Sequence, residues 1–103
     1  MTRPTQGMRL TDHEIDSIKT AVHHFDPEAQ IFIFGSRAHD SAAGGDIDLL
    51  IESKTIQFDN RISILAAIKK MIGEQKIDLL VSKGIDNDID PFIQSIRKEM
   101  KQL

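Results

Sequence analysis

Apolar residues recur along the chain with helical spacing in three segments, separated by shorter runs of nearly continuous apolar character. The first helical group consists of Ile15, Ile18, Val22 and Phe25. Positions three and four residues apart lie on one side of a helix, so this group predicts one amphipathic helix. Thr11 precedes it and Glu14 follows three residues later, which is the spacing of a capping box. The pattern therefore predicts a helix that begins after Thr11.

Two further segments show the same periodicity. The apolar stripe of the segment 61–72 is Ile64, Leu65, Ile68 and Ile72. Asp59 or Asn60 can cap its start, and Gly73 suits its end. In the last segment Asp90 is the expected N-cap and Pro91 the first helical residue. Its expected inner face is Ile93, Ile96, Met100 and Leu103.

The apolar runs between these helices have the length and density of strands. They are QIFIFG at 30–35, DIDLLIE at 46–52 and KIDLLVS at 76–82. Short apolar runs bounded by glycine and polar residues are typical of buried strands. We expect an α+β fold with a mixed three-stranded sheet and helices mainly on one side.

Composition limits the classes of protein to which the chain can belong. With 103 residues it is one small domain, which we place at 10–103 after a flexible tail at 1–9. A net charge of −3 without a Lys/Arg cluster argues against a nucleic-acid polymer as the main ligand. The absence of cysteine excludes thiolate zinc sites. No signal or membrane-spanning segment is evident, so we expect a cytoplasmic protein.

Aspartates lie at the start of two apolar strands with nearly the same sequence. Asp46 and Asp48 precede or enter IDLLI, and Asp78 enters IDLLV. Alternate residues of a strand share a face, so the first two carboxylates lie about 6 to 7 Å apart. If the two strands are neighbours, Asp78 joins them. Three carboxylates require a cation or a raised pKa, and magnesium is the expected ion.

A candidate phosphate site follows the first strand, in the sequence FGSR. Gly35 lets a ligand approach the backbone, and Ser36 and the amides of a helix start can bind phosphate oxygens. The guanidinium of Arg37 matches a phosphate, and His39 is a weaker candidate. The chain has neither a Walker loop nor the G-x-G-x-x-G fingerprint.

A purely structural interpretation remains for each motif taken alone. A single Asp-x-Asp occurs often in turns and caps. The acidic loop 86–90 imitates a calcium loop but has Pro91 where glycine is needed, so we interpret it as a solvated loop with a helix cap. The Gly-Ser strand end, the aspartate pair and the phased third aspartate are jointly hard to explain by structure alone.

These motifs resemble the Gly-Ser, Asp-x-Asp and third-Asp signature of the polymerase β-like nucleotidyltransferases, and specifically the minimal nucleotidyltransferases that act as antitoxins. The likeness covers residues 10 to 103. It implies a polymerase β-like nucleotidyltransferase core in which Asp46, Asp48 and Asp78 bind two Mg²⁺ ions, with Mn²⁺ as a substitute. It also implies that Gly35 and Ser36 hold the phosphates of ATP or another nucleoside triphosphate. His39 and Asp40 depart from the Arg-Gly of many members.

The resemblance further implies a protein adenylyltransferase. Minimal members attach AMP to a tyrosine of a small helical HEPN-type ribonuclease toxin, with which this chain would form a hetero-oligomer. The alternative is a non-catalytic binding module that neutralises a helical partner by direct contact. The three aspartates favour the enzyme, because a binding module gains nothing from clustered charge.

Overall fold

The computed structural model describes residues 10–38 and 46–103, and it confirms an α+β fold. The predicted tail at 1–9 lies outside these residues. The helices are α1 (Asp12–Phe25), α2 (Asn60–Ile72) and α3 (Pro91–Ile96), with short 3-10 helices η1 (Gly35–Ala38) and η2 (Ile85–Asn87). The strands are β1 (Gln30–Phe34), β2 (Ile47–Glu52), β3 (Ile77–Ser82) and β4 (Lys101–Gln102). None of the helices in the described ranges is long and apolar enough to span a membrane.

The described strands form one mixed sheet in the order β3-β2-β1-β4. Strand β1 is antiparallel to both β2 and β4, whereas β2 and β3 are parallel. The parallel pair is connected through α2, which is the usual solution for a parallel crossover. The expectation of three strands was therefore wrong by one short edge strand.

The fourth strand replaces the end of the predicted last helix. Helix α3 ends at Ile96, and the chain then turns to place Lys101 beside Ile33 of β1. Met100 packs on the α3 side of the sheet, but Leu103 packs into the core on the other side. In a continued helix Met100 and Leu103 would lie on the same side, but they pack on opposite faces of the sheet. The helix therefore ends, and an extended segment brings Leu103 to the other face.

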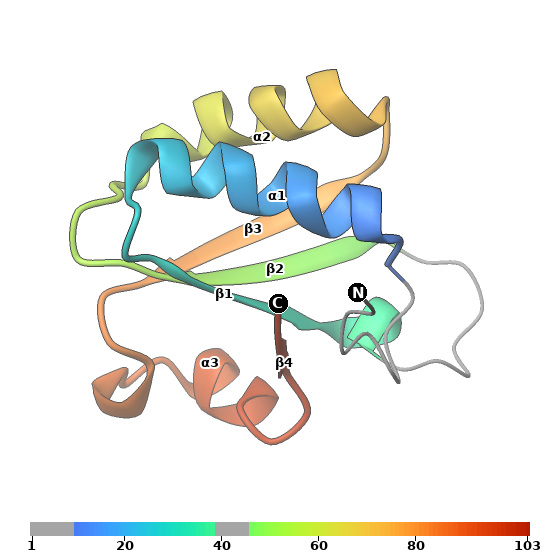
Figure 1. Ribbon diagram of the computed structural model, residues 1–103. Helices are drawn as coiled ribbons and strands as arrows, with labels where there is room; N and C mark the ends of the chain where they lie inside the picture. Colours follow the sequence, from blue (N-terminus) through green and yellow to red (C-terminus); the bar gives the residue numbers. More distant parts are fainter. Residues whose placement is uncertain (1–9, 39–45) are drawn as a thin grey trace.

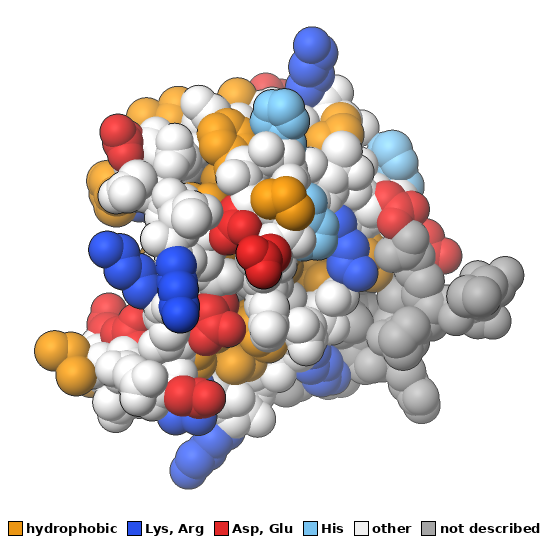
Figure 2. All heavy atoms as spheres, turned by 60° about the vertical axis from the view of Figure 1, so that its left-hand side comes forward, with side chains coloured by type: hydrophobic (Ala, Val, Ile, Leu, Met, Phe, Trp, Pro, Cys, Tyr) orange, Lys and Arg blue, Asp and Glu red, His pale blue; other side chains and the backbone are white. Residues whose placement is uncertain are grey.

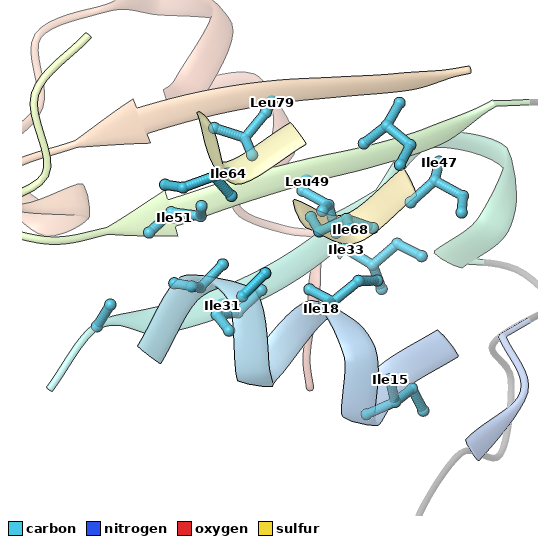
Figure 3. Packing of buried hydrophobic residues seen from close by; sticks show 14 of the residues in the cluster. Ile15, Ile18, Ile31, Ile33, Ile47, Leu49, Ile51, Ile64, Ile68 and Leu79 are labelled. Carbon is cyan, nitrogen blue, oxygen red and sulfur yellow. The ribbon is translucent and has the colours of Figure 1, made fainter. Parts of the chain in front are cut away.

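Both faces of the sheet are covered, although unequally (Figure 1). On one face α1 and α2 pack against Ile47, Leu49 and Ile51 of the central strand, and Figure 3 shows this core. On the opposite face the fully buried Leu50 packs in a smaller cluster with Ile93 of α3. The expected arrangement with helices mainly on one side is thus not confirmed, because β2 is apolar on both faces and α3 covers the second.

The helix ends follow the sequence signals except at the start of α2. Thr11 and Glu14 form the predicted capping box of α1. Gly73, with a φ of 89°, ends α2 in the left-handed region. Asp90 caps α3 by accepting a hydrogen bond from the Phe92 amide at 2.9 Å. The expected cap of α2 is not formed: Asp59 takes the N-cap position without a side-chain hydrogen bond, and Asn60, the first helical residue, accepts from the Gln57 amide at 2.7 Å.

A buried polar contact joins the loops at the ends of α1 and β2. The Ser53 hydroxyl donates to Asp26 at 2.5 Å and accepts from the amides of Thr55 and Ile56 at 3.2 and 3.0 Å. The hydrogen bond from Ser53 and that from the Glu28 amide hold the pKa of Asp26 below its usual range.

Figure 2 shows acidic and basic side chains intermingled on the side of the molecule that faces the viewer.

We expect Ser53→Ala to lower the free energy of unfolding by about 1 to 3 kcal/mol, because it removes one donor and leaves two amides without their acceptor. The folded-state pKa of Asp26 is depressed, so its stabilising contribution is present above 3.8, the ordinary pKa, and is lost as the pH falls further. Denaturant titrations should therefore show a smaller difference between wild type and variant near pH 3 than near pH 7. A difference independent of pH would exclude this role for Asp26.

Candidate active site

The parallel pairing of β2 and β3 brings two of the predicted aspartates side by side. Asp48 lies directly opposite Asp78 in the register, as the matching IDLLI and IDLLV sequences predicted. Neighbouring strands lie about 4.8 Å apart, and both side chains project from the sheet face that carries Leu50 and Leu80. The pair stands at the start of both strands, beyond the apolar cluster under α3.

The electrostatics of this pair favour a proton or a cation. The pKa of Asp48 is raised from 3.8 to about 6, first by burial and then by the charge of the Asp78 carboxylate and a hydrogen bond with it. The charge of Asp46 raises it further, while Lys76 lowers it. The Lys76 ammonium lies 3.6 Å from Asp46 Oδ2, at a site open to solvent. The charge of Asp48 is thus compensated only in part by its neighbours.

Gly35 closes the other side of Asp48. It follows β1 directly, has a φ of 72° and packs its backbone against the Asp48 carboxylate. A β-carbon at this position would overlap Asp48 Oδ2. The left-handed backbone therefore favours glycine at the strand end, and an added β-carbon would also force the Asp48 carboxylate to move.

The remaining predicted residues are placed only in part. Ser36 and Arg37 lie in η1, directly after Gly35. Their side-chain positions are not described, and His39 and Asp40 lie outside the described ranges. The acidic loop 86–90 contributes nothing to this site: Asp86 pairs with Arg97 at 2.7 Å, and Asp90 caps α3.

The donor chemistry fits a hard divalent cation. Carboxylate oxygens are the ligands that Mg²⁺ prefers, and a cation beside Asp48 and Asp78 would relieve their repulsion. Across 10–38 and 46–103, however, no three acidic, histidine or cysteine side chains are grouped as metal ligands. Asp46 is engaged with Lys76, so a third ligand from Asp46 requires that this solvent-exposed ion pair separate. Such a pair is weak, with a stability of about 0 to 1 kcal/mol.

Sequence reasoning missed Lys76. It immediately precedes β3. Because the register aligns the starts of β2 and β3, Lys76 lies beside Asp46 and forms an ion pair with it. The signal in the sequence was the lysine immediately before IDLLV, at the position that corresponds to Asp46 before IDLLI.

Substitution of Gly35 by alanine should destabilise the protein by about 1 to 3 kcal/mol, because it combines an unfavourable φ with the overlap at Asp48. Thermal unfolding of Gly35→Ala, Asp48→Ala and the double variant separates the two terms. If Asp48→Ala recovers part of the loss caused by Gly35→Ala, the overlap is real. If the losses of stability in the two single variants simply add in the double variant, the unfavourable φ alone accounts for the effect of Gly35→Ala.

Asp48→Asn should make the metal-free protein more stable at neutral pH. Because the folded-state pKa of Asp48 lies above 3.8, its ionisation destabilises the folded state increasingly as the pH rises through about 6. The gain should be small below pH 4 and about 1 kcal/mol above pH 7, since solvent screens a partly exposed group. Urea unfolding in the presence of a chelator measures it. Lower stability of the variant at pH 7 would instead assign Asp48 a structural role.

Comparison with known proteins agrees with this geometry. The family model described as "Nucleotidyltransferase domain" matches residues 15–103, which include both β2 and β3 and the strand end at Gly35. No individual curated protein matches the chain at a significant level. The match confirms the predicted polymerase β-like nucleotidyltransferase core at the level of the domain. The chain therefore belongs to the nucleotidyltransferase domain family, and nucleotidyl transfer from a nucleoside triphosphate is the reaction class that this family assigns to it.

Proposed function

We propose that this chain transfers AMP from ATP to a hydroxyl group of a partner protein. The observation that carries the proposal is the side-by-side placement of Asp48 and Asp78 next to the Gly35 backbone, in a chain that the nucleotidyltransferase family model covers almost completely. The site has a phosphate side at the end of β1 and a carboxylate side on β2 and β3.

The reaction moves one nucleoside monophosphate. The acceptor hydroxyl gives its proton to the Asp78 carboxylate or to water, and its oxygen forms a bond with the α-phosphorus. The bond from that phosphorus to the oxygen shared with the β-phosphate breaks, and pyrophosphate leaves with the electron pair. Divalent cations, which this family usually uses, lower the pKa of the acceptor hydroxyl and neutralise the phosphates when bound.

Each residue has a distinct proposed role. Asp46, Asp48 and Asp78 would hold two Mg²⁺ or Mn²⁺ ions through their carboxylate oxygens. Gly35 would let the β- and γ-phosphates approach the backbone, and Ser36 and Arg37 would bind phosphate oxygens. Asp78, on the outer strand, would lie nearest the acceptor.

The acceptor belongs to another chain in this proposal. The sequence contains no tyrosine, so a tyrosine that accepts AMP must come from a partner. We propose a HEPN-type helical toxin as that partner and an antitoxin role for this chain, on the resemblance to minimal nucleotidyltransferases. A binding module that neutralises the toxin without chemistry is the competing function, and the adjacent carboxylates of Asp48 and Asp78 favour the enzyme.

Mass spectrometry of both chains tests the proposed transfer. With Mg²⁺, ATP and a HEPN-type partner, we expect the mass of one added AMP on the partner and none on this chain. Asp48→Asn should abolish the addition, with Asp12→Asn on the exposed start of α1 as the control. Neutralisation of the toxin by Asp48→Asn without any change of mass would support the binding module instead.

Ser36→Ala separates phosphate binding from metal binding. It removes one hydroxyl and leaves the three carboxylates, so we expect affinity for ATP to fall about fivefold to tenfold while affinity for Mn²⁺ is retained. Calorimetric titration with ATP and with Mn²⁺ measures both. Equal loss of the two affinities would contradict the proposed division of roles.

A further inference from the structure

A groove lies beside the second half of β3, where the loop that leads into α2 approaches the start of α3. Its volume is about 420 Å³, which is within the range of about 300 to 1,000 Å³ for pockets that hold ligands. The aliphatic side chains that line it are Ile56, Leu80, Val81 and Ile93. Leu80 follows Asp78 by two residues on the same face of β3, so the groove begins about 7 Å along the strand from the carboxylate pair.

Two phenylalanine rings line this groove and are largely exposed. Phe58 is 78% exposed and Phe92 is 51% exposed. The Phe92 ring is held in place by an edge-on contact with the buried Phe34 ring, with 5.8 Å between the centroids. A small ligand inside the groove would leave most of both rings in water, whereas a protein surface would cover them. The rings therefore favour a partner protein as the occupant.

Arg61 gives the groove a hydrogen-bond donor that the chain does not use. Its guanidinium lies 4.6 Å from the centre of the Phe58 ring, which attracts the positive charge but supplies no oxygen acceptor. Its Nε is buried and has no hydrogen-bond partner in the described part of the protein. A buried donor without an acceptor is costly, and a carboxylate is the acceptor that matches a guanidinium best. An acidic group that enters the groove would therefore gain a partly dehydrated cation as its partner.

The other charges around the groove narrow the choice of partner. Lys83 adds a second positive charge. Asp90 also lines the groove, but its carboxylate caps α3 by accepting from the Phe92 amide. Nucleic acid is the less suitable partner, because its phosphates would meet the Asp90 carboxylate and the chain as a whole carries a charge of −3. An apolar side chain with a carboxylate next to it matches both the aliphatic lining and Arg61.

We propose that this groove binds an acidic segment of a partner protein, with one apolar side chain against Phe58 and Phe92 and a neighbouring carboxylate on Arg61. Side chains alone make these contacts, and the backbone of β3 takes no part in them. The partner is the protein that accepts AMP, because the groove adjoins Asp78 along β3. This last step rests on the proposed function.

Peptide titrations of the ¹⁵N-labelled chain, followed through its amide resonances, test the groove without ATP or metal. The probes are two pools of capped peptides, Ser-Glu-X-Glu-Ser and Ser-Gln-X-Gln-Ser, in which X is leucine, isoleucine, methionine or phenylalanine. The acidic pool should shift the amides of Phe58, Arg61 and Phe92 and bind about tenfold more tightly than the neutral pool. Non-specific attraction cannot produce this preference, because a chain with a net charge of −3 repels acidic peptides.

Substitutions separate the charged contact from the apolar one. Arg61→Met keeps an unbranched apolar stem and removes the guanidinium, so the two pools should then bind equally. Phe58→Ser should weaken both pools about fivefold, because it removes an apolar wall at an exposed position. Lys70→Met, on the exposed side of α2, removes the same charge away from the groove and should preserve the preference for the acidic pool.

Several results would overturn the proposal. One is the absence of shifts at the three groove amides with either pool at millimolar concentration. Another is a preference for the acidic pool that Arg61→Met leaves unchanged. Larger shifts of the same amides with a single-stranded RNA decamer would assign the groove to nucleic acid instead. A dimer in sedimentation that Phe58→Ser dissociates would assign it to a second copy of this chain.

The outcome is separable from that of the proposed function. Asp48→Asn should bind the acidic pool as wild type does, even though it would not transfer AMP. In the transfer reaction, Arg61→Met should raise the KM for the partner protein about tenfold and leave the KM for ATP unchanged. Peptide binding without any transfer would remove the enzymatic function and leave the docking groove. Transfer with an unchanged KM for the partner would remove the groove as its docking site and leave the enzyme.

Discussion

The parallel pairing of β2 with β3 is the constraint on which the rest of the structure depends. Its register aligns two nearly identical apolar runs and, with them, Asp48 and Asp78. A shift by one residue would turn every side chain to the other face, so the buried Leu49 and Leu79 and the paired carboxylates are fixed together. The core that stabilises the sheet thereby also determines the geometry of the site.

The alignment has an electrostatic cost that the fold does not remove. Asp48 is partly buried beside another carboxylate, and the nearest described compensation is Lys76, which lies against Asp46. On the other side of Asp48 lies the backbone of Gly35, so close that a β-carbon at position 35 would overlap Asp48 Oδ2. An arrangement that holds like charges together favours a bound cation over the free site, because the ion is the group that relieves the repulsion. The proposal that these residues carry the family's chemistry rests on this repulsion.

Strand β3 is the outer strand of the sheet, so the carboxylate pair lies between the centre of the sheet and its edge. One side of the carboxylate pair adjoins the strand end at Gly35, and the other is β3, which pairs with β2 alone among the described strands. The exposed Phe58 and Phe92 and the unsatisfied Arg61 donor line a groove with Leu80 and Val81 of that strand.

The sequence by itself determined the three main strands, the two long helices, the capping box of α1, and the candidate site. These features depend on local periodicity, on capping residues and on the repeated IDLL sequence. Only the tertiary structure decided that α3 covers the second face, that the chain ends in β4, and that Asp46 pairs with Lys76. The reason is that each of these depends on which elements become neighbours. Leu103 has a helical spacing from Ile96, but its burial against β1 and α1 outweighs the weak local preference to continue a short helix.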